Sequence, residues 1–208
     1  CWKTGSESGP ARAWVGMTSA AYSEFCKREE DLPNASCLAM QRLYFDGQEY
    51  WPLFEGKQIG QFDYAFASYA GVSKDEIRGG NPHRIVHSAE WIVETPRPRF
   101  WCLNSIVKAF LANKGIQTRW VLCYRDVTNV NNERTTIATF LPLGGTLQPL
   151  NGITCADTKA AIRILAALNS FACDYVARLR FTGRHLNVTT FSQLPIPARR
   201  WDEIVAPR

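Results

Sequence analysis

The stretch that decides the fold is residues 118–142, which read TRWVLCYRDVTNVNNERTTIATFLP. Two runs rich in β-branched and aromatic residues, 118–124 and 135–141, flank a polar centre. Such runs are typical of paired β-strands, and the connection between them is too long for a two-residue hairpin turn. We therefore expect two strands joined by a polar loop. Its arginine and asparagine side chains suit base edges or phosphates, although a solvated loop is the simpler interpretation.

Elements on both sides of this pair alternate without a regular β-α-β rhythm. Apolar residues recur at helical spacing over 100–114, where Gly115 is placed to end a helix. Residues 156–180 form the longest predicted helix. The residues predicted to form its buried stripe are Ile162, Leu165, Leu168, Ala172, Tyr175, Val176 and Leu179. The sequence thus predicts an α+β fold with a mixed or antiparallel sheet, packed helices and a long C-terminal helix.

Shorter elements follow from capping and turn signals. Thr18 or Ser19 is placed to cap a helix over 20–28, and Asp46-Gly47 signals a turn after a strand over 37–45. The remaining predictions are a loop with short strands at 51–64, a surface excursion at 71–84, a strand at 86–93, a turn at 143–152 and a polar turn at 182–190 that leads into a short strand.

Composition indicates a globular chain. The 208 residues are 46% hydrophobic and 21% charged, enough for a sizeable core. The net charge of +5 suits a polyanionic partner without requiring one. Because the chain begins with cysteine, we expect a fragment of a longer protein. Its predicted divisions are a linker or an entering strand at 1–16 from a missing N-terminal domain, one domain at 17–197 and a tail at 198–208.

The seven cysteines include no CxxC pair, and the three histidines do not pair with them at ligand spacing. Buried free thiols in a reducing cytoplasm are therefore expected, and no zinc site. No apolar run approaches the ~18 residues of a membrane span, and a signal peptide is not evident, so we expect a cytoplasmic location and no membrane partner.

One catalytic arrangement is an alternative. Asp46, Glu55 and Lys57 imitate the carboxylates and lysine of metal-dependent nucleases, in which the acids bind Mg²⁺ and the lysine positions water. Gly56 stands inside this motif and weakens the strand that normally presents both side chains on one edge. A Mg²⁺-dependent nuclease domain therefore stays open as an alternative function.

Three blocks of sequence, in this order, resemble a known family. The blocks are FEGKQIGQFD at 54–63, YRDVTN with NNERT at 124–135, and a C-terminal set made of LNSF, DY, GRHLN and QLP between 168 and 195. They are similar to segments of the C-terminal target-recognition region of adenine-specific DNA methylases. These enzymes belong to bacterial restriction–modification and phage-defence systems, including the fused type IIG enzymes. The resemblance covers about residues 50–197, and Gly60 departs from it where a bulky residue or histidine is expected.

The resemblance implies a domain that selects the DNA sequence on which a methylase, or a fused restriction endonuclease, acts. The family's methyl-donor site lies upstream, outside this chain. The implied partners are double-stranded DNA and the N-terminal methylase domain of the same parent chain. No catalytic residue and no cofactor are expected in this fragment, and S-adenosylmethionine is expected in the missing domain. A protein-interaction module of a phage-defence complex is a further alternative.

The residues expected to meet DNA carry cationic or amide side chains, which can pair with base edges or with phosphates. The expected base-reading residues are Arg125, Asn129, Asn132 and Arg134, the expected phosphate contacts are Lys57, Arg97, Arg99 and Arg184, and Gln61 and His185 complete the DNA-binding set. For Gln61, bracing its own loop is at least as plausible, and Glu133 could equally form an ion pair with Arg134. The polar residues expected to serve the fold alone are Asn169, Asp174 and Asn187.

Overall fold

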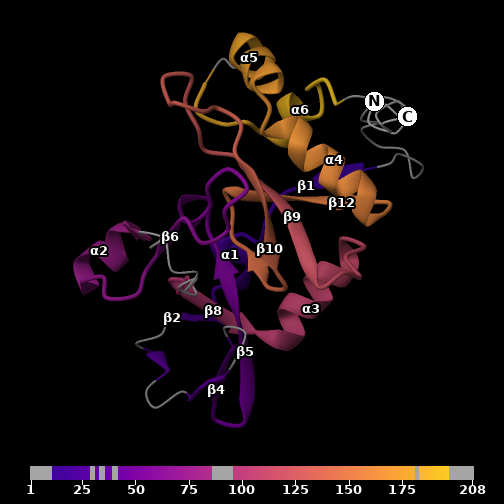
Figure 1. Cartoon of the computed structure of the whole chain (residues 1–208). Coiled ribbons are helices and arrows are strands. Elements are labelled where there is room, and N and C mark those ends of the chain that lie inside the picture. Colours follow the sequence, from indigo (N-terminus) through magenta and orange to yellow (C-terminus); the bar gives the residue numbers. More distant parts are fainter. Residues whose placement is uncertain are drawn as a thin grey trace, which may run out of the picture.

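A central antiparallel sheet organises the molecule (Figure 1). The computed structural model describes residues 11–28, 31–32, 36–38, 42–85, 96–180 and 183–196. The central sheet has the strand order β1-β12-β9-β10. Its strands are β1 (Ala11–Trp14), β9 (Trp120–Arg125), β10 (Ala138–Pro142) and β12 (Leu150–Cys155). The predicted strand pair is confirmed, because β9 and β10 run antiparallel with Leu122 opposite Phe140. The α+β class is confirmed as well.

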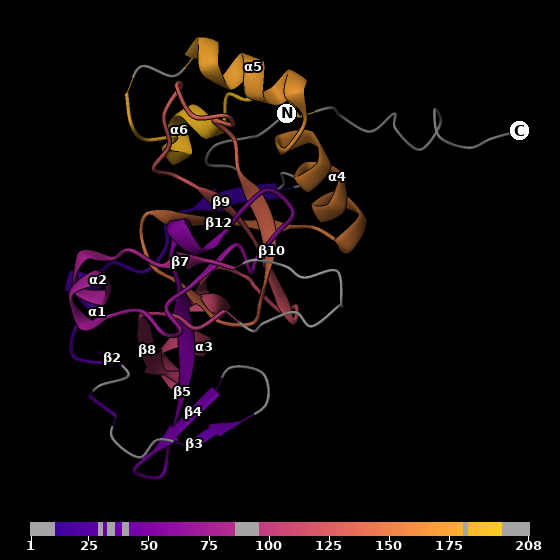
Figure 2. The same cartoon turned by 60° about the vertical axis from the view of Figure 1, so that its left-hand side comes forward.

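A second, six-stranded sheet lies beneath the first in Figure 1 and Figure 2, with the order β2-β8-β5-β4-β3 and β11 beside β5. Its strands are β2 (Cys26–Arg28), β3 (Ser36–Leu38), β4 (Arg42–Phe45), β5 (Gln48–Phe54), β8 (Phe100–Leu103) and β11 (Gly145–Thr146). The pair β11–β5 is parallel and the other pairs are antiparallel, so this sheet is mixed. Strands β6 (Ala67–Ser68) and β7 (His83–Arg84) form a separate small pair.

Helices cover one face of the central sheet. They are α4 (Thr158–Leu168), α5 (Phe171–Arg180) and α6 (Val188–Phe191). Between them and the sheet lies a core that includes Ile153, Leu165 and Phe191. The ring of Phe191 stacks on Tyr124 of β9 with centroids 3.7 Å apart. Asn187 caps α6 by accepting from the Thr190 N–H at 2.8 Å, which confirms its structural role. The short strand predicted after the turn at 182–190 is wrong, since α6 runs to Phe191 and the described residues beyond it, 192–196, form no strand.

The predicted long C-terminal helix is wrong, because it breaks between Leu168 and Phe171 and the two halves meet at 66°. Asn169 turns its side chain into the sheet, where it bonds both the N–H (3.0 Å) and the C=O (2.8 Å) of Ala138. Ser170 then starts α5 by accepting from the Cys173 N–H at 3.2 Å. These side-chain bonds compete with continued helix. Among the described residues no single helix is long and apolar enough to cross a membrane, and α4 with α5 passes only as a bent pair, by length and composition.

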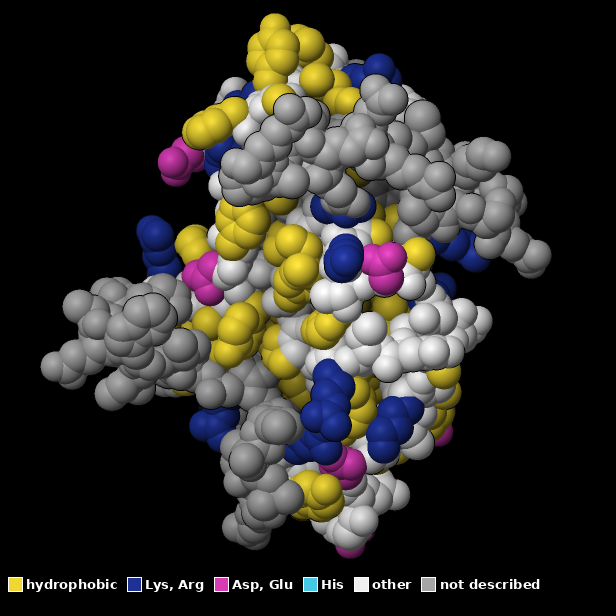
Figure 3. Space-filling view, turned by 45° about the vertical axis from the view of Figure 1, so that its right-hand side comes forward, with side chains coloured by type: hydrophobic (Ala, Val, Ile, Leu, Met, Phe, Trp, Pro, Cys, Tyr) yellow, Lys and Arg dark blue, Asp and Glu magenta, His cyan; other side chains and the backbone are white. Residues whose placement is uncertain are grey.

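This break splits the predicted buried stripe. Leu165 and Leu168 of α4 are buried as predicted, whereas Tyr175 and Leu179 of α5 are 64% and 68% exposed. Ile162 is exposed too. Helix α5 instead faces inward with Cys173, Asp174 and Ala177, which are buried. Hydrophobic side chains accordingly reach the surface at the top of the molecule, where α5 lies (Figure 3).

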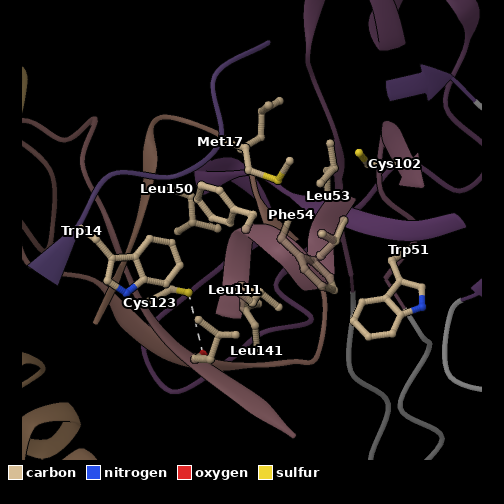
Figure 4. Packing of buried hydrophobic residues seen from close by; sticks show 14 of the residues in the cluster. Trp14, Met17, Trp51, Leu53, Phe54, Cys102, Leu111, Cys123, Leu141 and Leu150 are labelled. Carbon is tan, nitrogen blue, oxygen red and sulfur yellow. Dashed lines mark hydrogen bonds between the residues drawn. The ribbon is translucent and has the colours of Figure 1, made fainter. Parts of the chain in front are cut away.

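The other face of the central sheet packs on the second sheet and on helix α3 (Asn104–Asn113). Figure 4 shows this core, where Trp14 and Met17 meet side chains of β5, β9 and β12. Trp14 also packs edge-on against Phe110 at 5.6 Å. Residues 11–16 thus belong to the folded body and are not a linker, which corrects the predicted boundary. Residues 1–10 and the predicted tail at 198–208 lie outside the described residues.

Strand β9 is buried on both faces, which explains its continuous apolar run. Val121 and Cys123 belong to the core between the sheets, and Leu122 and Tyr124 belong to the core beneath the helices. Successive side chains of a strand point to opposite faces, so a central strand between two cores is apolar throughout. The strand therefore ends where its side chains become polar, at Arg125 and Asp126.

Tertiary pairing changed two predicted helices. Helix α1 (Ser19–Tyr22) begins at its predicted cap, with the Thr18 hydroxyl accepting from the Ala21 N–H at 3.3 Å, but residues 26–28 pair with β8 as a strand. Residues 100–103 are that strand, so α3 begins later than predicted; it does end before Gly115, whose φ is +74°. Strands β2 and β8 thus come from segments whose local pattern alone favours a helix.

Turn predictions fared better. Asp46 and Gly47 join β4 to β5 with φ of +49° and +69°, as the turn signal indicates. Residues 71–84 hold the exposed helix α2 (Lys74–Gly79), and Gly56–Gln58 form the 3-10 helix η2. The predicted turn at 143–152 instead contains β11 and the start of β12. The strand predicted at 86–93 lies outside the described residues.

Candidate nucleic-acid interface

Three of the residues predicted to bind DNA lie on two chain segments that pair where the central strand ends. Beyond β9, the chain pairs with the segment after α5: the Asp126 carbonyl accepts from the Leu186 N–H at 2.8 Å. Val127 forms a bridge with His185, and the Thr128 N–H donates to the Arg184 carbonyl at 3.1 Å. This pairing brings the segment with the exposed Arg184 and His185 alongside residues 126–128, directly after Arg125 at the end of β9. We call these three residues the strand-end cluster.

Arg125 differs from the other arginines of the predicted site, because its guanidinium is half-buried and nothing in the described part of the chain pairs with it through a hydrogen bond, ion pair or ring contact. Burial lowers the pKa of Arg125 below its ordinary value. Gly56 lies against its side chain: a Cβ at position 56 would stand 3.3 Å from the Arg125 Cγ. A partly desolvated cation without a counter-charge costs stability, so the position favours an external anion or hydrogen-bond acceptor.

A buried polar network supports His185. The Asp126 carboxylate is 6% exposed, and its Oδ1 lies 3.3 Å from His185 Nδ1. Its Oδ2 accepts from the Asn151 amide at 3.4 Å, and that amide also donates to the Tyr124 hydroxyl at 3.1 Å. Burial raises the pKa of Tyr124, which keeps its hydroxyl neutral. The network turns the His185 ring so that Nδ1 faces Asp126, while the side chain stays 62% exposed.

The loop that follows, residues 129–134, is fastened to α5. Asp174 Oδ1 accepts from the backbone N–H of Thr135 at 2.6 Å and of Thr136 at 2.8 Å, and its Oδ2 accepts from Arg178 at 2.9 Å. Arg178 also donates to three loop carbonyls, those of Val130, Asn132 and Glu133. Asp174 is therefore structural, as predicted, and Arg178 holds the loop against α5.

The predicted base-reading residues of this loop serve it in different ways. Arg134 donates to the Asn169 carbonyl at 2.6 Å, lies 3.8 Å from Asp174 Oδ1 and is mostly buried. Its charge is thus paired with Asp174, while Glu133 is exposed. Asn129 accepts from the Asn131 N–H at 2.9 Å in a local turn, and Asn132 is exposed. Of this loop, only Asn132 offers an exposed side chain from the predicted set.

The remaining predicted contacts lie around β5 and α2. Lys57 donates to the Gly80 carbonyl at 2.6 Å, at the C-terminal end of α2 where a cation is favourable. Arg99 forms a buried ion pair with Glu55 at 2.6 Å and also donates to the Ile77 carbonyl. Both cations therefore have internal partners. Arg97 is exposed, and its carbonyl accepts from the Gln58 amide at 3.1 Å.

The loop that carries Gln61 is braced, in line with the alternative kept open for that residue. The Gln61 side chain donates to the Thr136 carbonyl at 3.1 Å, which ties this loop to the entry of β10. Gly60, the departure from the family pattern, is required here for a steric reason: a Cβ would stand 2.8 Å from the Phe66 ring. A bulky residue at position 60 would therefore force this loop to change shape.

The nuclease arrangement is not assembled in the structure. Asp46 lies in the turn before β5 and Glu55 directly after it, so the length of the strand separates them, roughly 25 Å or more. Glu55 is paired with Arg99 and Lys57 with the end of α2. Within the ranges that the structure describes, no three His, Cys, Asp or Glu side chains are grouped to hold a metal ion. Asp46 and Glu55 consequently cannot bind one Mg²⁺ ion together.

Comparison with known proteins identifies no relative of this chain. No protein-family model matches the chain, and neither a curated protein nor a solved structure is similar to it.

Sequence reasoning missed Asp126 and Asn151, which orient His185. Asp126 follows Tyr124 by two positions, and residues at that spacing share one face of an extended strand. That spacing was the available signal for Asp126. Asn151 had none, since it lies directly opposite Tyr124 only through the pairing of β12 with β9.

Proposed function

We propose that this chain is a DNA-recognition domain that holds duplex DNA for a methyl-transfer domain elsewhere in its parent chain. The observation that carries the proposal is the Arg125 guanidinium, half-buried and without an internal partner at the end of the central strand. Arg184 and His185, both exposed, lie on the segment that pairs with the residues just after Arg125, and they add a positive charge and a hydrogen-bonding ring. The sequence blocks that resemble the target-recognition region of adenine-specific methylases support the same function.

Each residue of the strand-end cluster has a defined chemical task in this proposal. The planar fork of Arg125 suits guanine O6 and N7 or two phosphate oxygens, because it presents parallel donors. Arg184 pairs with a neighbouring phosphate, and His185 donates or accepts through the ring nitrogen that does not face Asp126. The remaining interface is supplied by the exposed Asn132 and Arg97.

The chain's task is positioning and not bond chemistry. By holding the duplex at a fixed register, it allows an adenine to be flipped into the pocket of the methylase domain, which would bind S-adenosylmethionine. The proposed parent is a bacterial, cytoplasmic adenine-specific DNA methyltransferase of a restriction–modification or phage-defence system. Whether that parent is fused to an endonuclease does not alter the role of this domain.

The test is duplex-DNA binding by the 208-residue chain, measured by fluorescence anisotropy on a pool of random-sequence duplexes at low and physiological salt. Arg119 is the matched control, because it is exposed just before the opposite end of β9 and its replacement changes the net charge equally. We expect Arg125→Ala to weaken binding about tenfold, the loss of one good bidentate contact. Arg119→Ala should leave binding nearly unchanged.

Two results would overturn the proposal. The first is equal binding by Arg125→Ala and Arg119→Ala, which would mean that only overall charge matters. The second is an absence of duplex binding by the wild-type chain at low salt, where phosphate contacts are strongest. Selection of a preferred sequence from the bound pool would then sharpen a positive result, because loss of preference at one base pair in Arg125→Ala identifies the base that Arg125 reads.

A further inference from the structure

The outer face of α5 carries an apolar stripe that nothing in the described chain covers. Phe171, Tyr175 and Leu179 are 83%, 64% and 68% exposed, the highest values among the large apolar side chains of the described residues. They stand at positions i, i+4 and i+8, so they form one line along the helix. Figure 3 shows hydrophobic atoms at the surface in this part of the molecule. We call these three residues the α5 stripe.

The stripe cannot turn inward, because polar bonds fix the opposite face of the helix. Asp174 is bonded to the backbone of Thr135 and Thr136, and Arg178 is bonded to the loop carbonyls. Rotating α5 to bury the stripe would leave these groups unpaired in a low-dielectric interior, which is costly. The exposure of the stripe is thus part of the fold, and a contiguous exposed apolar patch marks a binding surface.

The rim of the stripe is cationic. The Arg134 guanidinium lies 4.3 Å from the centroid of the Phe171 ring and backs one of its faces. Arg178 and Arg180 end the helix, and Arg180 is exposed. Of the acidic residues in α5 and the loop fastened to it, Asp174 is buried and paired with Arg178, and Glu133 is exposed. The fitting partner therefore offers flat apolar faces together with negative charge.

We propose that the α5 stripe binds unpaired bases of single-stranded nucleic acid, which stack on Phe171 and Tyr175 while Arg180, the exposed arginine of the rim, meets a phosphate. Aromatic side chains along a positively charged track are the usual platform for such strands. A protein partner fits less well. Two aromatics at ~150–250 Å² each and one leucine offer about half of the ~800 Å² that one side of a stable protein interface buries.

The inference extends the proposed function to the same DNA. Flipping an adenine out of a duplex leaves unpaired nucleotides near the recognition domain, and these are the ligand that the stripe suits. The chain also connects the two surfaces, since Arg184 follows the end of α5 by four positions. The stripe and the strand-end cluster use different residues, so their contributions can be measured separately.

The experiment measures binding of a labelled thymidine oligonucleotide of about 20 residues to the 208-residue chain at low salt. We expect the double variant Phe171→Ser/Tyr175→Ser to bind about tenfold more weakly, as expected for the loss of base stacking. The matched control is Phe62→Ser/Ile162→Ser, which removes two apolar side chains that are also exposed, elsewhere on the surface. Tyr175→Trp should retain or strengthen binding, because it keeps the stacking surface.

An abasic oligonucleotide of the same length and charge isolates the bases as the cause. The wild-type chain should bind the abasic strand as weakly as the double variant binds the thymidine strand. The double variant should bind the two strands equally. A uridine oligoribonucleotide of equal length then shows whether DNA or RNA is the preferred source of the bases. Equal binding of the thymidine and abasic strands by the wild-type chain would overturn the inference.

The inference and the proposed function fail in different ways. Arg125→Ala should weaken duplex binding and spare single-strand binding, whereas the stripe variant should do the reverse. If Arg125→Ala has no effect but the stripe variant does, the strand-end assignment is wrong and the stripe stands. If the stripe variant binds single strands normally but abolishes self-association seen by sizing chromatography, the stripe is a protein contact and the inference is wrong.

Discussion

Arg125 and Arg134 come from the same short stretch of sequence, yet the fold treats them in opposite ways. Arg134 is bonded to the Asn169 carbonyl, approaches Asp174 and lies over Phe171. Arg125 stands at the end of β9, partly buried, with no counter-charge in the described chain. The residue type is the same, and the difference lies in whether the fold supplies a partner. An arginine already paired inside the protein holds the structure, and one left unpaired is available to a ligand.

The largest expected effect concerns Asp174, the carboxylate that pairs with Arg134 and Arg178. Asp174→Asn should lower the free energy of unfolding by about 3–5 kcal/mol, because it leaves Arg178 and Arg134 near a group that no longer balances their charge. Urea denaturation measures the change. The control Asp75→Asn, which removes a fully exposed partner of Arg78, should shift stability by no more than about 0.5 kcal/mol. A loss of similar size in both variants would show that Asp174 holds nothing in particular.

Replacing each of the two arginines by methionine tests this difference directly. Arg134→Met should destabilise the chain by about 2 kcal/mol, since it orphans buried hydrogen-bond partners. Arg125→Met should be neutral or stabilising by about 1 kcal/mol, because it removes a desolvated cation that has no partner, yet it should weaken duplex binding. Unfolding curves and anisotropy on the same preparations check both signs. Equal destabilisation by the two changes would contradict the assigned difference.

Acid should lower the stability of the chain by protonating Asp174, the partner of Arg134 and Arg178. Burial by itself raises the pKa of Asp174, but hydrogen bonds from Thr136, Arg178 and Thr135 outweigh it, and the net pKa is lowered. A lowered folded-state pKa means that the carboxylate adds stability above the unfolded value of about 3.9, and that this is lost as the pH falls through the folded value.

We therefore expect the stability of the wild-type chain to fall more steeply below about pH 4 than that of Asp174→Asn. Urea midpoints collected from neutral to acidic pH provide the measurement. Parallel curves for the two proteins would place the acid-sensitive group elsewhere.

The smallest expected effect concerns His185, the exposed partner of Asp126 in the strand-end cluster. His185→Gln should change stability by less than about 0.5 kcal/mol, because the ring is mostly exposed, and should weaken duplex binding about threefold. Arg184→Gln serves as the neighbouring comparison and should reduce the salt dependence of binding by one phosphate contact. A large loss of stability in His185→Gln would instead make His185 a structural partner of Asp126.

Local signals in the sequence predicted the parts of the molecule that depend on near neighbours. The antiparallel pair β9–β10, the Thr18 and Asn187 caps and the Asp46-Gly47 turn all match. Each of them involves residues a few positions apart or two adjacent apolar runs. The predicted DNA-binding set includes residues that the fold itself uses, because Lys57, Arg99 and Arg134 have internal partners. Those partners lie 22 to 44 positions away along the chain.

The sequence by itself determined the α+β class, the central strand pair and the turns that join short elements, since alternation, capping and glycine geometry act locally. Tertiary structure alone decided that Asn169 would leave its helix for the backbone of β10, that α5 would turn its apolar stripe outward, and that Arg125 would stay unpaired. The physical reason is competition. A polar side chain takes the buried partner with the best geometry, and which partner stands within reach is known only once distant segments have packed together.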